Sequence, residues 1–383
     1  MLSQHLNSKL PELGTTIFTI MSQMAKDHNA INLAQGFPDF KCSQQLVDHV
    51  GKYLNTGFNQ YAPMPGVLPL RQKIAEKSNR LYNADYDADT DITITCGATE
   101  ACYVAITTLI SKGDEVLVFE PAFDCYTPAI QLSGGVPVYV HLKYPDYKID
   151  WDEVKKKISA KTRLIIINSP HNPTGAVLEE EDINALKAIV ANTGIFILSD
   201  EVYEHIIFDQ KKHLSLSAYP ELKERSIVVS SFGKTFHTTG WRVGYAAAPE
   251  YLSKEFRKVH QYTTFSVPTP MQLAIADFME EEQHYLSLPD FYQEKRDLFL
   301  SLLSKSSFTM IPTSGTYFQL LDYSAFSKEN DVELAYRLTK EVGVACIPVS
   351  VFYHDKADYK VLRFCFAKES QTLKNAAEKL CKI

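Results

Sequence analysis

The sequence predicts an α/β fold in which a large domain carries a mainly parallel, doubly wound sheet and a smaller domain is α+β. The chain has 383 residues, which is more than one hydrophobic core usually contains. Between Asp91 and Ala248, seven short runs of strand-forming residues alternate with helical patterns. Several of these runs are apolar throughout, which is typical of parallel strands covered by helices on both faces.

The seven-stranded sheet is expected from the runs DITIT, EVLVFE, PVYV, RLIIIN, IFILSD, SIVVSS and VGYAAA, with a helix over 98–110 after the first run. After about Pro289 the pattern changes to helices over 292–303, over 331–342 and at the end of the chain, mixed with the strand-like runs FTMIP, GTYFQLLD, VACIP and VLRFCFA. A helical pattern over 16–27 precedes the main sheet region. We therefore predict a large domain over 46–288 and a small domain formed by 1–45 and 289–383.

The composition excludes several classes of function. A net charge of −7, without clustered Lys and Arg, argues against nucleic-acid binding. The seven cysteines are odd in number and include no C-x-x-C pair, so we expect reduced thiols in the cytoplasm and no metal site. The N-terminus is polar and no long apolar stretch is present, so we expect that the chain is not exported and does not insert into a membrane.

Polar residues that follow the predicted strands are the candidate site residues, because ligands of such sheets bind beyond the carboxyl ends of the strands. The strongest signal is SSFGKTFHTTGWRVG, in which a buried strand leads to a small-residue turn with Lys234, and Arg242 follows a short loop later. A lysine in a buried or cationic site can lose its proton and attack an aldehyde, forming a Schiff base. Ser231 and Arg242 are candidate phosphate ligands.

Two further strand ends carry polar side chains. LIIINSPHNPTG leads to Asn172, which can donate a hydrogen bond to a phenolic oxygen. ILSDEVYEHIIF places Asp200 and Tyr203 one turn apart. The carboxylate can pair with a protonated pyridine nitrogen, and the tyrosine can reach a ring hydroxyl.

A fourth motif, TCGATEA, changes from strand to helix at Gly97, Ala98 and Thr99, where free backbone N–H groups suit a phosphate. In their order and spacing, the four motifs resemble the class I/II aminotransferases, which are fold-type I enzymes dependent on pyridoxal 5′-phosphate (PLP). The resemblance covers nearly the whole chain. It is strongest for the methionine and kynurenine aminotransferase subgroup, through NLAQGFPDF, NQYAPMPG, EPAFDCY, SPHNPTG, SDEVYEH and SSFGKTFHTTGW.

The resemblance implies that PLP is the cofactor, held by Lys234 as a Schiff base, and that Lys234, Asp200 and Tyr203 are the catalytic residues. Phe123 would stack on the cofactor ring, with Tyr126 close by on the substrate side. These roles depend on the family and are expectations for this chain.

The resemblance also implies substrate-binding roles. Arg363, in LRFCFA, matches the arginine that binds the substrate α-carboxylate, for which a guanidinium fork is the right shape. In a homodimer with shared active sites, Tyr61 would reach across the interface to the phosphate of the cofactor in the neighbouring subunit, and Phe265 would also contribute to the neighbouring site. Gly36 would lie in the loop that closes over the substrate, and Phe18 would stand where many relatives have a tryptophan. Asn172 would contact substrate as well as cofactor.

The activity implied is a ping-pong transfer of an α-amino group between an amino acid and a 2-oxo acid. The apolar lining predicts methionine, aromatic or leucine-like donors in place of aspartate. His237 and Thr238 depart from the broader class, and this departure favours methionine over kynurenine. The alternatives are kynurenine–oxoglutarate transamination and C–S β-lyase activity on cysteine conjugates. The β-lyase is an alternative because transamination and β-elimination proceed through the same carbanion.

Two other classes of protein fit the sequence less well. An aminotransferase-like effector module of a transcription regulator would carry a basic DNA-binding domain ahead of the fold. A nicotinamide oxidoreductase would carry G-x-G-x-x-G after a strand, and that motif is missing.

Overall fold

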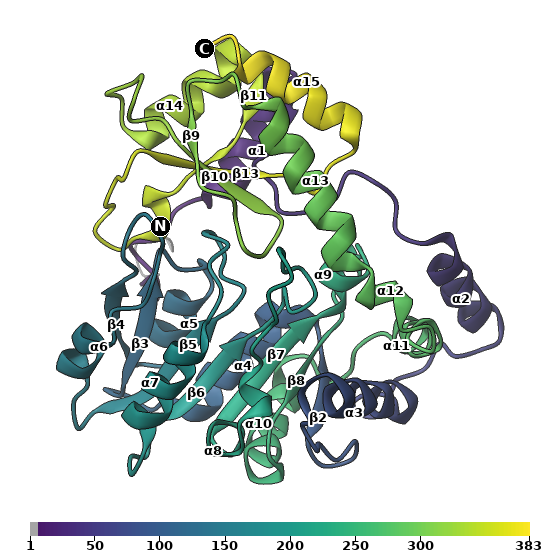
Figure 1. Cartoon of the computed structure of the whole chain (residues 1–383). Coiled ribbons are helices and arrows are strands. Elements are labelled where there is room, and N and C mark those ends of the chain that lie inside the picture. Colours follow the sequence, from purple (N-terminus) through teal and green to yellow (C-terminus); the bar gives the residue numbers. More distant parts are fainter. Residues whose placement is uncertain (1–6) are drawn as a thin grey trace.

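A computed structural model describes residues 7–383, and its largest element is a seven-stranded sheet (Figure 1). The strand order is β2-β8-β7-β6-β5-β3-β4. β8 runs antiparallel to both of its neighbours, and every other neighbouring pair is parallel. The seven predicted runs form β2 (Ile92–Thr95), β3 (Glu115–Glu120), β4 (Val136–His141), β5 (Thr162–Asn168), β6 (Phe196–Asp200), β7 (Ser226–Ser231) and β8 (Gly244–Ala247). The predicted fold class is confirmed.

Two helical layers cover the sheet, which explains why its central strands are apolar throughout. In β5, Leu164 and Ile166 belong to one buried cluster, and Ile165 and Ile167 belong to the other, since successive side chains point to opposite faces. The first cluster includes residues of α4 (Gly97–Leu109), α5 (Tyr126–Leu132) and α10 (Glu250–Thr263). The second includes residues of α6 (Trp151–Lys157), α7 (Glu180–Val190), α8 (Pro220–Lys223) and α9 (Phe232–Thr235).

A smaller unit lies above the carboxyl ends of the parallel strands (Figure 1). Its four-stranded antiparallel sheet has the order β12-β13-β10-β9, and β1 pairs in parallel with β11. The strands are β1 (Ile31–Asn32), β9 (Thr309–Met310), β10 (Phe318–Asp322), β11 (Val344–Ala345), β12 (Ile347–Pro348) and β13 (Val361–Cys365). The helices are α1 (Ile17–Asp27), α13 (Leu288–Leu302), α14 (Asp331–Arg337) and α15 (Ser370–Leu380). A π-helical turn, Leu338–Val342, continues α14, so the single helix predicted over 331–342 changes type halfway.

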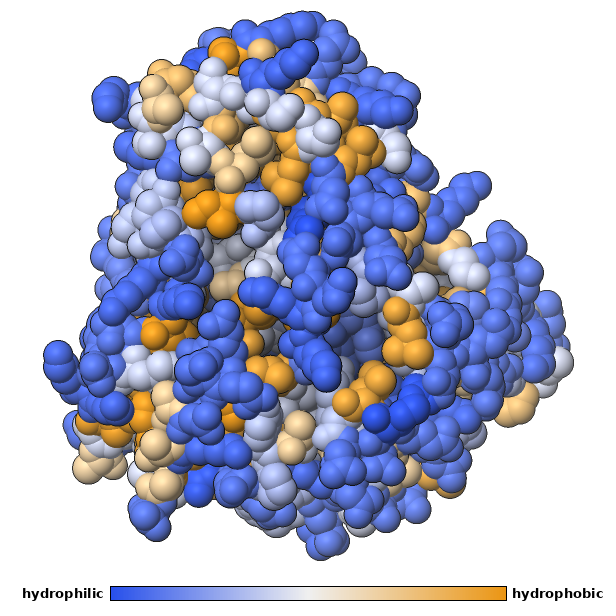
Figure 2. Space-filling view, viewed as in Figure 1, coloured by the Kyte–Doolittle hydropathy of each residue, from blue (hydrophilic) through white to orange (hydrophobic). Residues whose placement is uncertain are grey.

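The remaining helices pack near the β2 edge of the large sheet. They are α2 (Gln44–Asn55), α3 (Leu68–Tyr82), α11 (Thr269–Phe278) and α12 (Gln283–Leu286). The surface seen in Figure 2 is mostly hydrophilic, with apolar side chains in small separate groups. Within residues 7–383, no helix combines the length and apolar character that a membrane crossing requires.

Candidate active site

An anion-binding cradle forms where β7, β8 and the start of α4 meet. The register places Ser231 of β7 opposite Gly244 of β8. A Cβ atom added to Gly244 would lie 3.0 Å from the backbone nitrogen of Ala98, so the helix start packs directly on this strand. At Gly97, with φ +74°, an added Cβ would lie 2.6 Å from Nη2 of Arg242. Only glycine therefore allows the guanidinium to lie across the N-terminus of α4.

The cradle is open to a ligand. Thr99, in the first turn of α4, is exposed, and so is Arg242, while Ser231 is buried at the strand end. Arg242 Nη1 donates to the carbonyl oxygen of Thr239 at 2.9 Å, which fixes the orientation of the guanidinium. A hydroxyl, a guanidinium and free helix N–H groups in one place fit a phosphate group.

Asp200, the last residue of β6, is a buried carboxylate whose hydrogen-bond donors are neutral. The Tyr126 hydroxyl donates to Oδ2 at 2.5 Å, and the backbone N–H of Val202 donates to Oδ1 at 3.3 Å. Burial raises the pKa of Asp200 to about 6. A cationic ring nitrogen beside this carboxylate would supply the positive charge that the surrounding protein does not place in contact with it.

Lys234 projects from α9, directly after β7, and its amine also has neutral partners. Nζ donates to the Tyr317 hydroxyl at 2.9 Å and to the carbonyl oxygen of Gly36 at 3.2 Å. Removal of the amine from water lowers the pKa of Lys234 to about 8, and the charges of Arg363 and Arg242 act in the same direction. About a tenth of such an amine is neutral at pH 7, which makes it a nucleophile and a proton acceptor.

Arg363, on β13, is buried and only partly satisfied by the protein. Nη1 donates to the Asn172 side-chain oxygen at 2.8 Å, and Nη2 donates to the carbonyl oxygen of Ala34 at 3.0 Å. Nε is buried and has no partner within residues 7–383. Burial lowers the pKa of Arg363 to about 10, so the group remains a cation at neutral pH. It can bind a carboxylate.

Aromatic rings surround these charged groups. The Tyr203 ring centre lies 5.7 Å from Lys234 Nζ, and the Phe18 ring centre lies 5.3 Å from the Arg363 guanidinium carbon. Phe123 lies edge-on to Tyr126, with ring centres 5.9 Å apart. The structure thus brings nearly all of the predicted residues from 18 to 363 into one region at the strand ends.

Tyr61 and Phe265 are the exceptions. They form a surface pair with ring centres 5.4 Å apart, and their exposed fractions are 82% and 43%. His237 also stands apart from Lys234. Its ring packs edge-on against Phe40 at 4.9 Å and Tyr292 at 5.7 Å, so it shapes the wall behind the site.

Two contacts were not predicted from the sequence. Tyr317 contacts Lys234 although it lies in the run GTYFQLLD of the other sheet, and nothing in that run distinguishes it from an ordinary strand tyrosine. Tyr126, expected on the substrate side, is buried and directs its hydroxyl to Asp200. It therefore fits a residue that positions the carboxylate.

The site can also be compared with known proteins. The family model "Aminotransferase class I and II" matches residues 28–380. The chain belongs to this family. Its cofactor is accordingly PLP, and its reaction is the transfer of an amino group from an amino acid to a 2-oxo acid. The phosphate cradle, the buried carboxylate and the amine of Lys234 fit this cofactor.

Individual relatives cover almost the whole chain. The chain is 54% identical over 374 residues to a methionine aminotransferase of Escherichia coli, covering 97% of each protein. It is 34% identical to a kynurenine–oxoglutarate transaminase of Dictyostelium discoideum, covering 97% of this chain and 94% of that protein. A crystal structure of an Escherichia coli protein with a methionine aminotransferase function superposes with a TM-score of 0.96, at 52% identity, covering 99% of both chains.

Proposed function

We propose that this aminotransferase uses methionine as its preferred amino donor and also accepts other apolar and aromatic amino acids. The observation that carries the proposal is the environment of Arg363. Its guanidinium carbon lies 3.8 Å from the ring centre of Phe318, 5.3 Å from that of Phe18 and 5.5 Å from that of Phe352. A substrate whose α-carboxylate binds Arg363 meets aromatic rings, and these favour a thioether or an apolar side chain over a second carboxylate.

Binding of the cofactor is assigned to residues from four strand ends. Ser231, Arg242 and the N–H groups at the start of α4 hold the phosphate. Asp200 keeps a proton on the ring nitrogen, and Tyr126 holds the carboxylate in place. Asn172 and Tyr203 are assigned to the phenolic oxygen, with Phe123 against the ring.

The chemistry divides between the cofactor and the chain. Bound PLP supplies an electron sink for the carbanion that forms at the substrate α-carbon. Arg363 orients the substrate by its carboxylate, and the closely packed rings exclude water. Lys234 takes the α-proton and returns it, which requires a neutral amine, and its lowered pKa provides one.

We further propose a homodimer in which Tyr61 and Phe265 complete the partner's site. Their exposure supports this role, since both rings are large, apolar and adjacent on the surface. The separation of the seven-stranded sheet from the two smaller sheets supports the division into a large domain, 46–288, and a small domain, 1–45 with 289–383. Seven free cysteines are compatible with a cytoplasmic location.

The proposed specificity is tested by steady-state kinetics of the holoenzyme with methionine, phenylalanine, leucine, kynurenine and aspartate as donors. We expect the highest kcat/KM for methionine and a value at least about 100-fold lower for aspartate, since a second carboxylate would be buried among rings. Comparable values for aspartate and methionine would overturn the proposal. Release of pyruvate and ammonia from a cystathionine-like substrate at a higher rate than transamination would instead favour a C–S β-lyase.

A matched variant sharpens the test. Phe18→Ala opens the aromatic wall without touching Lys234, so kcat/KM should fall more for methionine than for alanine as donor. Phe18→Trp restores an aromatic wall and should keep the preference for methionine. An equal loss of kcat/KM for both donors would show that Phe18 does not line the pocket for the substrate side chain.

A further inference from the structure

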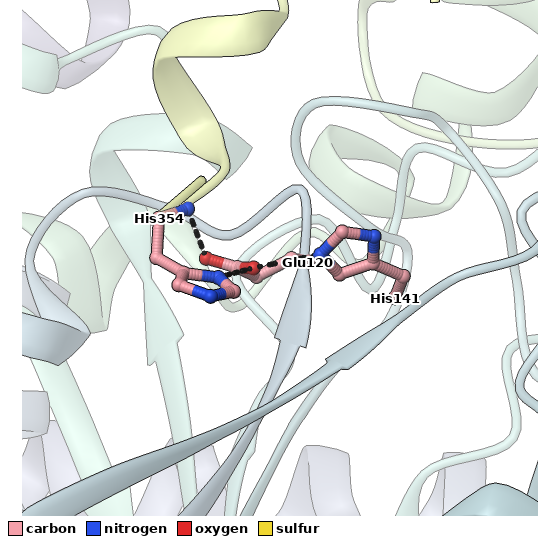
Figure 3. Close-up of side chains that lie close together, drawn as sticks. All are labelled: Glu120, His141 and His354. Carbon is pink, nitrogen blue, oxygen red and sulfur yellow. Dashed lines mark hydrogen bonds and ion pairs between the residues drawn. The ribbon is translucent and has the colours of Figure 1, made fainter. Parts of the chain in front are cut away.

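A cluster of two histidines and a buried glutamate lies at the edge of the large sheet and includes none of the residues assigned to PLP (Figure 3). Glu120 ends β3 and pairs in register with His141, which ends β4. Because the strands are parallel and in register, the two side chains project from the same face. His354 enters from the smaller unit, in the loop after the 3₁₀ turn Ser350–Phe352.

The ligand atoms converge on one carboxylate oxygen. His354 Nδ1 lies 2.7 Å from Glu120 Oε2, and His141 Nε2 lies 3.4 Å from the same oxygen. One nitrogen or oxygen atom from each of the three residues lies within 4.8 Å of the other two. His141 Nε2 also lies 3.6 Å from Oδ2 of Asp355. Ligands of a tetrahedral zinc ion lie about 3.3 Å apart, so this spacing is close to that of a zinc site.

The surroundings orient the ligands as they do in metal sites. The second oxygen of Glu120, Oε1, accepts the backbone N–H of His354 at 2.7 Å, which turns Oε2 toward the two imidazoles. The His354 ring stacks on Tyr139, with centres 4.1 Å apart and planes 8° apart. Glu120 is 2% exposed, whereas both histidines are partly exposed, so the cluster has a path to solvent. Such outer contacts hold a ligand in the orientation that a metal requires.

We propose that Glu120, His141 and His354 form a binding site for a divalent transition metal, with zinc as the best fit and Asp355 as a fourth ligand. Imidazole and carboxylate ligands are those that zinc takes in sites without cysteine. The sequence predicted no metal site because the ligands are far apart in the chain and follow no short motif.

A bound ion would have a structural effect. Glu120 and His141 belong to the large sheet, and His354 belongs to the smaller unit, so one ion would cross-link the two. The backbone already joins them beside the cluster, where the N–H of Ala122 donates to the carbonyl oxygen of Phe352 at 2.9 Å. Zinc should therefore raise the thermal unfolding temperature of the holoenzyme, because it binds the folded chain and the unfolded chain lacks the site.

The experiment titrates zinc chloride into untagged, dialysed holoenzyme by calorimetry, and uses cobalt absorbance to report the coordination. We expect one ion per chain and visible bands of a four-coordinate cobalt site. His141→Ala and His354→Ala should each weaken zinc binding at least about tenfold, and the double variant should abolish the saturable site. Binding should also weaken at acidic pH, because imidazole must lose its proton to bind a metal.

His284→Ala is the matched control. His284 pairs with Glu281 at 3.5 Å, outside the cluster, so this variant should bind zinc as the parent does. Retention of PLP and of transaminase activity by every variant shows that each is folded, so the zinc test does not depend on the proposed substrate. A parent enzyme that binds no zinc, or a His284→Ala variant that loses as much affinity as His354→Ala, would overturn the proposal.

Discussion

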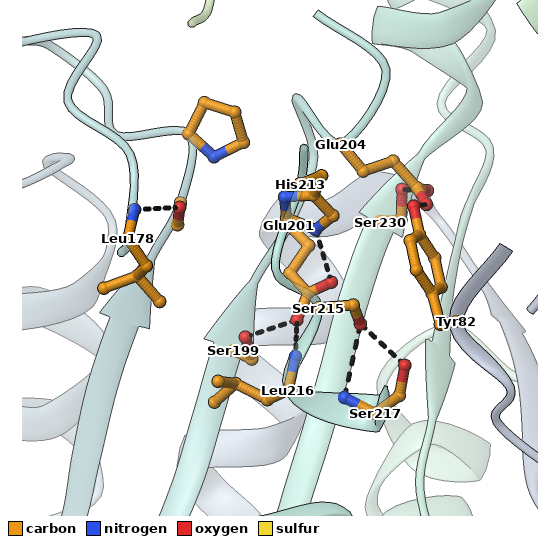
Figure 4. A network of polar contacts seen from close by, with 12 residues as sticks. Tyr82, Leu178, Ser199, Glu201, Glu204, His213, Ser215, Leu216, Ser217 and Ser230 are labelled. Carbon is orange, nitrogen blue, oxygen red and sulfur yellow. Dashed lines mark hydrogen bonds and ion pairs between the residues drawn. The ribbon is translucent and has the colours of Figure 1, made fainter. Parts of the chain in front are cut away.

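Asp200 and Glu204 are two buried carboxylates close together in the chain, and they differ in their hydrogen-bond donors and in the direction in which their pKa is shifted. Glu204 accepts hydrogen bonds from Ser230 at 2.7 Å and from Tyr82 at 2.7 Å (Figure 4). It also accepts a hydrogen bond from the amine of Lys77 at 2.6 Å. Burial by itself would raise the pKa of Glu204, but the charge of Lys77 lowers it well below its usual range. Asp200 has only neutral donors, and its pKa is raised.

The neighbouring Glu201 is also bound by several groups of the protein. It accepts hydrogen bonds from Ser199 and from the backbone of Leu216, and it lies 2.8 Å from His213 (Figure 4). The difference between Glu204, which pairs with Lys77, and Asp200 shows where a ligand belongs. A buried charge with a complete set of protein partners stabilises the fold, whereas a buried charge with neutral partners is completed by a ligand.

Variants of Lys234 and Lys77 should show the largest difference. Lys234→Ala should lower kcat at least about 10⁴-fold, because it removes both the covalent anchor and the proton-transfer group. Its effect on the free energy of unfolding should be small. Lys77→Met should do the reverse and cost about 3–5 kcal/mol of stability, since Glu204 would keep an unpaired buried charge.

Turnover assays and urea unfolding of the two variants check this prediction. Substantial transaminase activity in Lys234→Ala, or an unchanged unfolding midpoint in Lys77→Met, would contradict the assignment of the two lysines.

Variants of the two carboxylates should also differ in whether they lose activity or stability, with smaller effects than the lysine variants. Asp200→Asn keeps the shape of the side chain but removes the charge that stabilises the ring proton, so kcat should fall about 10²–10³-fold. Glu204→Gln should leave kcat within a few-fold of the parent and lower the unfolding midpoint. Steady-state kinetics and thermal unfolding of both variants check this prediction. Equal losses of kcat in Asp200→Asn and Glu204→Gln would contradict the different roles of the two carboxylates.

Arg363 tests the substrate side of the site. Arg363→Lys keeps the positive charge but loses the planar fork, so KM for methionine should rise about 10–100-fold, with a smaller change in kcat. PLP should remain bound, because Arg363 reaches the residues assigned to the cofactor only through its hydrogen bond to the Asn172 side chain. Loss of PLP from this variant would place Arg363 at the cofactor.

The pH dependence of cofactor capture tests the lowered pKa of Lys234. Only the neutral amine attacks the aldehyde of PLP, and a pKa of about 8 means that the neutral fraction rises about tenfold from pH 7 to pH 9. The rate at which the apoenzyme binds PLP should rise by the same factor and level off above pH 9. A rate that keeps rising beyond pH 10 would show an unshifted lysine.

The sequence predicted the parts of the site that depend on local pattern. Strands β5, β6 and β7 come from apolar runs, and Asp200 ends β6 while Asn172 and Lys234 lie shortly after the ends of β5 and β7. The edge of the sheet and its polar residues could therefore be predicted together. The contact of Lys234 with Tyr317 could not, because Tyr317 directly precedes β10 of the smaller unit, far from Lys234 in the chain.

The same limit applies to the buried pairs. Glu204 stands beside the predicted Asp200 and Tyr203, yet its partner Lys77 is 127 positions away, and no pattern links them. The satisfied and unsatisfied carboxylates therefore look alike in the sequence. Only their partners in three dimensions distinguish them.

The most direct test of the central claim is to find which lysine carries the cofactor. Reduction of the holoenzyme with borohydride makes the bond between lysine and PLP permanent, and mass spectrometry of the digested protein locates it. We expect the label on Lys234 and none on Lys77. A label on any other lysine, with Lys234 unmodified, would contradict this expectation.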